Sequence, residues 1–325
     1  MLGAGSWGTT VAALAAPRHD TVVWARNPAV AREIDEQHTN AQYLPDCALP
    51  VELRATGDLA DAVGRAQVLI VGVPTHGFRA ALDAARDHIH PWIPVVSLSK
   101  GFEQDSLLRM TEVIKQVLPG HPAAALTGPN IAREIIAGQA AASVIATDDL
   151  EVAVALQRLL QRGVFRLYTN HDVVGCEVGA ALKNVVAIAA GIAQGIAVGD
   201  NTRAAVITRG LAELTRLGVA MGGEPATFAG LTGMGDLVAT CVSPHSRNRR
   251  VGEQLGTGRK LADILADTTM VAEGVKTAVT VMTLAERYGV EMPICTEIYR
   301  VVQGEITGLD AYRGLHPAGH EADPG

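Results

Sequence analysis

The feature that most constrains the fold is one long apolar stretch, residues 172–199. It reads DVVGCEVGAALKNVVAIAAGIAQGIAVG, and its last 16 residues carry no charge. A membrane-spanning helix needs about 20 apolar residues, so we expect a buried core helix and no membrane span. Small residues at Gly179, Ala180, Gly191 and Gly195 allow neighbouring backbones to approach closely, which favours a helix inside a packed domain.

Lys183 lies in the middle of this apolar stretch. A buried ammonium group is unfavourable unless a carboxylate or other acceptors hold it. A lysine near a helix end can instead extend its aliphatic stem and keep its charge in water. Its position alone leaves both interpretations open, and the rest of the chain favours a functional lysine.

Length and charge narrow the classes of protein to consider. The chain has 325 residues, enough for two domains, and its net charge of −7 argues against nucleic acid or an anionic membrane as the main partner. An anionic small ligand therefore needs a local cationic cluster. The four cysteines are scattered, without CxxC or zinc-site spacing, which predicts no metal site and suits a reducing cytoplasm.

A glycine motif opens the chain, with Gly3, Gly5 and Gly8 spaced as G-x-G-x-x-G. The motif alone is weak evidence, since a chain with 34 glycines produces chance matches. Its context is stronger, because we expect a helix over residues 9–16 and a strand over 21–25. In dinucleotide-binding folds such glycines permit a tight turn and close approach of the pyrophosphate to a helix N-terminus.

Two features depart from that pattern. Only Met1 and Leu2 precede the motif, where a central strand normally feeds the loop, so we expect the natural chain to start several residues earlier. Arg26 stands at the end of the second strand, where NAD-specific sites place Asp or Glu on the ribose. An arginine can stack on adenine or pair with a 2′-phosphate, which favours tolerance of NADP; a solvated arginine is the alternative.

Further strands are expected at 68–73, 95–98, 123–126, 142–146 and 165–168. Their alternation with helical segments predicts an α/β domain, a doubly wound parallel sheet of the Rossmann type, over residues 1–170. Lys100 follows one strand end, where ligands bind in such sheets. Gly128 and Asn130 follow the next; Asn130 can cap a helix or bind a ligand hydroxyl.

The second half reads as all-α, with a substrate domain expected over residues 171–307 and a disordered tail over 308–325. We expect a helix at 203–220, capped by residues 200–202, and a tight ordered loop at 229–241. Asp236 in that loop requires a cation, backbone donors or a capping role. Residues 243–250 are densely basic and form either a solvated face or an anion site built on Arg247 and Asn248.

Taken together, these motifs resemble one family, the NAD(P)-dependent glycerol-3-phosphate dehydrogenases of the bacterial type. The matching stretches follow the family's order and cover nearly the whole chain: GAGSWGTT, VGVPTHGFR, SLSKGFE, LTGPNIARE, CEVGAALKNVVAIAAGIAQG, GDNTRAA, LTGMGDLVATC, SRNRRVG and VAEGV.

The resemblance implies a site residue by residue. Lys183 is the implied catalytic acid/base. The implied substrate contacts are Lys100, Gly128, Asn130, Lys183, Asp236, Ser246, Arg247 and Asn248. The implied cofactor contacts, beside the three glycines, are Ser6, Trp7, Arg26, Lys100, Ala132, Arg247, Val271 and Glu273. Family members often carry Thr or Ser at the position of Asn130.

The implied reaction transfers hydride between C4 of NAD or NADP and C2 of dihydroxyacetone phosphate, giving sn-glycerol 3-phosphate for glycerophospholipid synthesis. A carbonyl that accepts hydride becomes an alkoxide and needs a proton donor. Lys183 fits that role, with Lys100 assisting and Asp236 orienting it. Arg247 and Asn248 would bind the phosphate, and no metal is required.

Two alternatives remain at this stage. One is a related two-domain dehydrogenase that acts on a 2-hydroxy acid or a sugar nucleotide. The other is a non-catalytic NAD(P)-binding sensor, which would not need Lys183, Asp236 and Arg247 together. A homodimer through the helical half is a further expectation, from its apolar, small-residue surfaces.

Overall fold

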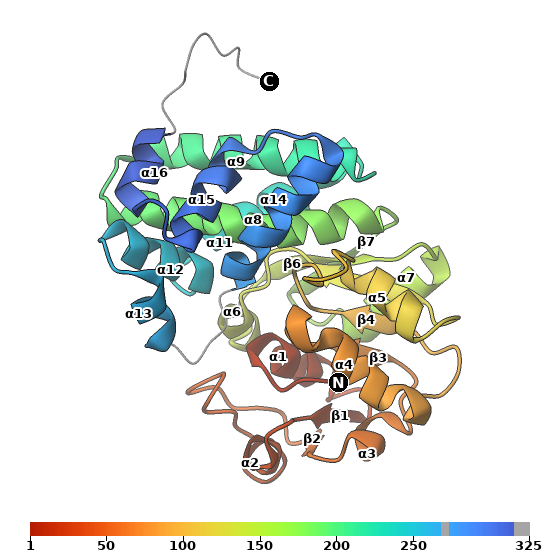
Figure 1. Cartoon of the computed structure of the whole chain (residues 1–325). Coiled ribbons are helices and arrows are strands. Elements are labelled where there is room, and N and C mark those ends of the chain that lie inside the picture. Colours follow the sequence, from red (N-terminus) through yellow and green to blue (C-terminus); the bar gives the residue numbers. More distant parts are fainter. Residues whose placement is uncertain (268–272, 315–325) are drawn as a thin grey trace. The chain divides into compact units, whose positions relative to one another are not determined.

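A computed structural model describes residues 1–267 and 273–314 of the chain. The chain divides into two compact units, Met1–Val173 and Val174–Gly325 (Figure 1). The first unit is α/β and the second is helical throughout its described part, which confirms the predicted fold class.

The first unit is built on a mainly parallel sheet. Its strands are β1 Thr21–Trp24, β2 Leu53–Thr56, β3 Leu69–Val71, β4 Val95–Ser97, β5 Ala123–Thr127, β6 Ala141–Ala146 and β7 Phe165–Asn170. β2 pairs with β1, and β3 to β7 pair in chain order. Strand β2 was not predicted, because its LRAT sequence has a single fully buried position.

The first residues of the chain join these two groups of strands. Leu2 forms parallel bridges to Trp24 of β1 and to Val71 of β3. The Leu2 N–H donates to Ile70 (2.8 Å), and the Gly72 N–H donates to the Leu2 carbonyl (2.7 Å). Residues 1–3 therefore take the central position that a longer first strand holds in this kind of sheet.

Helices cover both faces of the sheet, as side chains of successive strand residues alternate between two apolar clusters. Val96 of β4 packs in one cluster with α1 and α7, whereas Val95 packs in the other with α4 and α5. The helices of this unit are α1 Ser6–Ala15, α2 Pro28–Arg32, α3 Leu59–Val63, α4 Thr75–Ala85, α5 Met110–Val117, α6 Ala132–Ile136 and α7 Leu150–Leu160, with short turns η1 Glu33–Gln37 and η2 Arg86–His88.

One strand departs from the predicted parallel order. β6 runs antiparallel to β5, with Thr127 opposite Val144, and β7 then runs parallel to β6. The connection from β5 to β6 holds only the five-residue helix α6, which is short for the crossover that two parallel neighbours require.

The second unit is arranged around α8 Val173–Gly195, which Figure 1 shows beside α9 Asp200–Ala220. Its other helices are α10 Pro225–Ala229, η3 Leu231–Gly235, α11 Asp236–Val242, α12 Arg247–Gly256, α13 Leu261–Ala266, α14 Glu273–Tyr288, α15 Pro293–Gln303 and α16 Gly308–Gly314. Its apolar core includes Val186, Ala187 and Ala190 of α8 against Leu237 of α11.

α8 is longer than the uncharged run suggested. By length and composition alone its 23 residues are enough to cross a membrane, and 94% of its most apolar window is buried within the protein. The expectation that this stretch is too short to cross a membrane was therefore wrong, whereas the predicted core helix is present.

Three local predictions in this unit were wrong. Residues 231–241, predicted as part of a loop, are helical and lie in η3 and α11, because Gly233 packs directly on the Phe228 backbone. Asp200 does not cap α9 but lies inside it, after Gly199. Residues 308–314, predicted as part of a disordered tail, form α16, where Thr307 and Asp310 hydrogen-bond reciprocally at the helix start.

Candidate active site

The glycine loop before α1 has the geometry of an anion cradle. Gly3 has a φ of +103°, and a Cβ there would lie 2.8 Å from the Gly72 carbonyl oxygen. A Cβ on Gly8 would overlap the Gly3 carbonyl, so the helix can approach the strand only through glycine. A Cβ on Gly5 would meet no atom within 4 Å, which leaves that backbone open to a ligand.

The first turn of α1 presents its N–H groups without a side-chain cap, since Gly5 is the N-cap residue. Such donors, together with the helix dipole, suit a pyrophosphate. Asn40 holds the loop, donating from Nδ2 to the Ala4 carbonyl and to Thr9 Oγ1 (both 2.9 Å). Asn40 is fully buried and was missed by sequence reasoning, because it lies outside every recognisable motif. The loop therefore fits a dinucleotide.

The other predicted cofactor contacts of this unit lie in α1, after β1 and at the start of α6. Ser6 and Trp7 open α1, and the Trp7 ring packs edge-on against Phe165, with centroids 6.3 Å apart. Arg26 is exposed two residues after the end of β1. Ala132 opens α6, and its carbonyl accepts a bond from Thr10 Oγ1 of α1 (3.5 Å).

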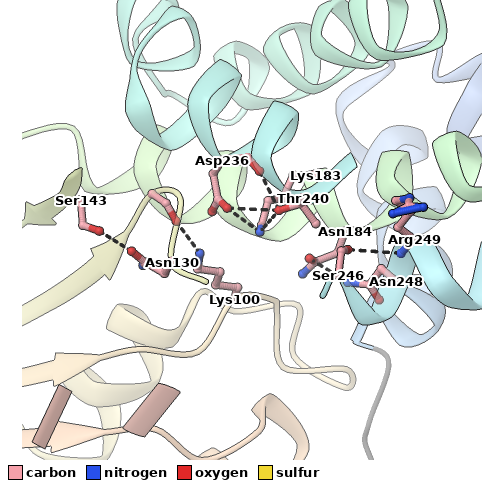
Figure 2. Close-up of polar contacts among 11 residues, drawn as sticks. Lys100, Asn130, Ser143, Lys183, Asn184, Asp236, Thr240, Ser246, Asn248 and Arg249 are labelled. Atoms are coloured by element: carbon pink, nitrogen blue, oxygen red, sulfur yellow. Dashed lines mark hydrogen bonds and ion pairs between the residues drawn. The ribbon is translucent and has the colours of Figure 1, made fainter. Parts of the chain in front are cut away.

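Three predicted substrate contacts meet at the ends of β4 and β5. Lys100 Nζ donates to the Gly128 carbonyl (2.8 Å). Asn130 accepts a short hydrogen bond at Oδ1 from Ser143 Oγ of β6, and Figure 2 shows both bonds. Asn130 does not cap α6, whose N-cap is Ile131, so that alternative is wrong. Ser143 was not predicted.

In the helical unit Lys183 forms a buried cluster with α11. Its Nζ donates to Asp236 Oδ1 (2.6 Å) and to Thr240 Oγ1 (2.5 Å), as Figure 2 shows. The Lys183 and Asp236 side chains are only 7% and 1% exposed. Asp236 thus has the cation that its apolar surroundings require. Thr240, one helical turn after Asp236, was missed, although the i, i+4 spacing places both on one face.

This cluster perturbs a neighbouring thiol. Burial raises the pKa of Cys241 to about 12, the Asp236 carboxylate adds to the rise and the Lys183 ammonium opposes it. Cys241 is therefore an inert thiol at neutral pH. Among the described residues, no group of three or more His, Cys, Asp or Glu side chains is placed to hold a metal ion.

A second polar cluster joins α8, α12 and α14. Asn248 Nδ2 donates to Asn184 Oδ1 (2.9 Å), and Asn248 Oδ1 accepts from the Gly274 N–H (3.0 Å). Ser246 is the N-cap of α12, and its Oγ accepts from the Arg249 N–H (3.3 Å). Asn184 was not predicted as a site residue, because no motif in the sequence indicates a partner for it.

The arginines of the basic segment, residues 243–250, have different environments. Arg247 is exposed at the first position of α12, where its charge and the helix N–H groups can meet an anion. Arg249 instead pairs with Glu253 one turn on. Glu273 opens α14, and Val271 lies outside the described residues.

Comparison with known proteins identifies the family. The model of the NAD-dependent glycerol-3-phosphate dehydrogenase N-terminus matches residues 1–153, and that of the C-terminus matches residues 172–312. The chain belongs to this family. The resemblance stated from the motifs is thereby confirmed.

The sequences and a solved structure of relatives match this chain over nearly their full length. A glycerol-3-phosphate dehydrogenase [NAD(P)+] 2 of Sphingopyxis alaskensis is 57% identical, over 100% of this chain and 98% of that protein. One from Mycobacterium avium is 50% identical over 99% and 95%. The crystal structure of glycerol-3-phosphate dehydrogenase from Coxiella burnetii superposes with a TM-score of 0.92 at 33% identity, covering 97% of both chains.

Proposed function

We propose that this glycerol-3-phosphate dehydrogenase family member interconverts dihydroxyacetone phosphate and sn-glycerol 3-phosphate, with NAD or NADP. The observation that carries the proposal is the buried Lys183–Asp236–Thr240 cluster, in a chain whose glycine loop fits a dinucleotide. The chain is 57% and 50% identical, over nearly its full length, to two proteins named glycerol-3-phosphate dehydrogenase, which supports dihydroxyacetone phosphate as the substrate.

When bound, the nicotinamide supplies or accepts the hydride. Lys183 handles the proton: as the ketone of the substrate becomes an alkoxide, an Nζ–H bond breaks and an O–H bond forms, leaving a neutral amine that water reprotonates. Asp236 and Thr240 restrict Nζ to one position, because both accept from it. Asp236 also compensates the charge of the ammonium group before transfer.

The phosphate of the substrate requires a cation outside the reacting centre. Arg247 is exposed at the N-terminus of α12 and can pair with it through two parallel N–H bonds. Its binding energy would position the carbonyl without taking part in the chemistry. Lys100, held by the Gly128 carbonyl, is the proposed assisting cation in the first unit.

The test is the absorbance of reduced nicotinamide in the presence of dihydroxyacetone phosphate, with NADH and NADPH in separate assays. We expect oxidation of at least one, and the ratio of the two rates reports the preference that Arg26 confers. A folded protein that binds cofactor but leaves both reduced with this substrate would contradict the proposal. Screening 2-hydroxy acids and sugar nucleotides would then separate a different dehydrogenase from a sensor.

We further propose that the protein works in the cytoplasm, as a homodimer, and supplies glycerophospholipid synthesis. The product is a glycerophospholipid precursor, and four free cysteines suit the cytoplasm. Met234, Val238 and Val242 form an exposed apolar row along η3 and α11, which supports a homodimer through the helical unit. Light scattering after size exclusion measures the mass in solution, and a monomer would contradict the homodimer.

A further inference from the structure

We propose that Ser143 is a positioning residue that fixes the Asn130 carboxamide so that its Nδ2 donates to an oxygen of the substrate. This inference rests on the proposed function and extends it to a residue in the interior of the sheet. Ser143 and Asn130 both lie in the first unit, and Figure 2 shows the hydrogen bond between them.

The loop carrying Asn130 is held where β5 ends. Gly128 has a φ of +107°, and a Cβ there would lie 3.2 Å from the Ser143 Cα, so this loop passes directly against β6. Lys100 Nζ binds the Gly128 carbonyl at 2.8 Å. The backbone before Asn130 is therefore fixed, which leaves the rotation of its side chain as the remaining freedom.

Ser143 removes that freedom. Its side chain is fully buried, and its hydroxyl donates to Asn130 Oδ1. With Oδ1 held by β6, the amide nitrogen must point the other way. Asn130 Nδ2 is itself buried and has no hydrogen-bond partner among the residues that the structure describes. A buried donor without an acceptor is unfavourable, and a ligand oxygen at this position would satisfy it.

The chemistry defines what the donor recognises. An amide N–H binds a carbonyl, hydroxyl or phosphate oxygen, and all three occur in dihydroxyacetone phosphate. The hydroxyl of Ser143 thus acts on the substrate through Asn130 and does not need to touch it.

The decisive experiment is a double-mutant cycle of Ser143→Ala and Asn130→Ala, measured as the KM for dihydroxyacetone phosphate. Each single variant should raise KM about tenfold, the typical effect of one hydrogen bond. In the Asn130→Ala background, Ser143→Ala should change KM less than about twofold, because its target is gone. The Kd for NADPH, measured by fluorescence, should stay within about twofold in all variants.

Two further variants separate positioning from packing. Ser143→Thr keeps the hydroxyl and should restore most of the wild-type KM. Thr147→Val removes the hydroxyl of another buried residue just beyond β6 and should leave KM unchanged. If Ser143→Ala does not fold, Ser143→Cys takes its place, since a thiol of similar size is only a weak donor.

The outcomes are distinct. Wild-type protein that does not reduce dihydroxyacetone phosphate overturns the proposed function. Active wild type with an unchanged KM in Ser143→Ala or Ser143→Cys overturns only the role of Ser143. Independent, multiplying effects of the two alanine variants would also overturn it, because they would mean that Ser143 acts on the fold and not through Asn130.

Discussion

The two units hold their site residues by different means. In the first unit, Lys100 is held by a backbone group at a strand end, the Gly128 carbonyl, although the side chain of Asn130 in the same loop is held by Ser143. In the helical unit, side chains on separate helices hold one another. Lys183 binds Asp236, which lies 53 residues later in the chain, and Asn184 binds Asn248, which lies 64 residues later. A site at strand ends depends on the sheet, whereas a site between helices depends on how closely the helices pack.

The largest expected effect is in the helical unit. Lys183→Ala should lower kcat by about 10²–10⁴-fold, the usual contribution of a positioned proton donor, with the Kd for the cofactor nearly unchanged. Asp236→Asn tests the pairing, because it removes the charge that compensates the buried ammonium. Single-turnover absorbance at the reduced-nicotinamide band measures the loss. Substantial turnover by Lys183→Ala would remove the acid/base assignment.

Helix spacing gives the next largest effect. Two pairs of glycines, Gly191 and Gly195 of α8 and Gly252 and Gly256 of α12, let these helices pack backbone against backbone. A Cβ on Gly252 would overlap the Ile188 carbonyl and lie 2.9 Å from the Gly191 Cα. α12 begins with Arg247 and Asn248, so its displacement would also move part of the candidate site.

Gly252→Ala should therefore lower the free energy of unfolding by about 3 kcal/mol and raise the KM for the phosphorylated substrate. Urea denaturation measures the first quantity. The sign of the change in unfolding free energy is informative, because replacing glycine by alanine inside an unconstrained helix would stabilise the protein by about 1 kcal/mol. Gly199→Ala, at the N-cap of α9, controls only for the added volume, since a Cβ there meets no atom within 4 Å. A stabilised Gly252→Ala variant would show that the close packing is absent.

The same difference explains what could be predicted from sequence. The glycine loop, most strands and the position of Lys100 follow from contiguous motifs, because strand ends converge at one edge of a sheet. Thr240, Asn184 and Ser143 could not be found that way, since their partners are set by tertiary packing. Residues 229–241 were misjudged for a related reason: Gly233, which packs against Phe228, looks like a loop residue in the sequence.

A buried carboxylate in the helical unit provides a smaller effect and a pH dependence. Glu213 of α9 accepts from the Ile294 and Cys295 N–H groups at the start of α15 (2.7 and 3.1 Å). Glu213→Ala would leave two buried donors unpaired, so we expect a loss of about 2 kcal/mol in the free energy of unfolding. Glu286→Gln, at an exposed position on α14, should have almost no effect.

The pH dependence has a definite sign. Burial raises the pKa of Glu213 above its usual 4.5, against the backbone donors and Arg216, which lower it. The folded protein therefore binds this proton more tightly than the unfolded chain does. The resulting stability is fully present below pH 4.5 and is lost as the pH rises through the raised pKa. Compared with Glu213→Gln, the wild type should lose stability over that range in urea titrations; a parallel pH profile would contradict the assignment.

The smallest effect is expected in the first unit, where the backbone already holds the loop that carries Lys100. Leu98 N–H donates to the Val71 carbonyl (2.9 Å), and Ser99 Oγ donates to the Val73 carbonyl (2.5 Å). Arg79 of α4 adds a two-point pair with Glu103, with both N···O distances 2.8 Å. The hydrogen bond from Arg79 lowers the pKa of Glu103, so the pair should weaken in acid, as the pH falls through that lowered pKa.

A double-mutant cycle of Arg79→Met and Glu103→Gln should give a coupling of about 1 kcal/mol in unfolding free energy, because the pair is partly exposed. High salt should reduce it. The KM for dihydroxyacetone phosphate should change less than about threefold, because the strand-end bonds still hold the loop that carries Lys100. A tenfold rise in KM at unchanged stability would break the comparison for Lys100, since the Arg79–Glu103 side-chain pair, and not the strand-end backbone, would then control its position.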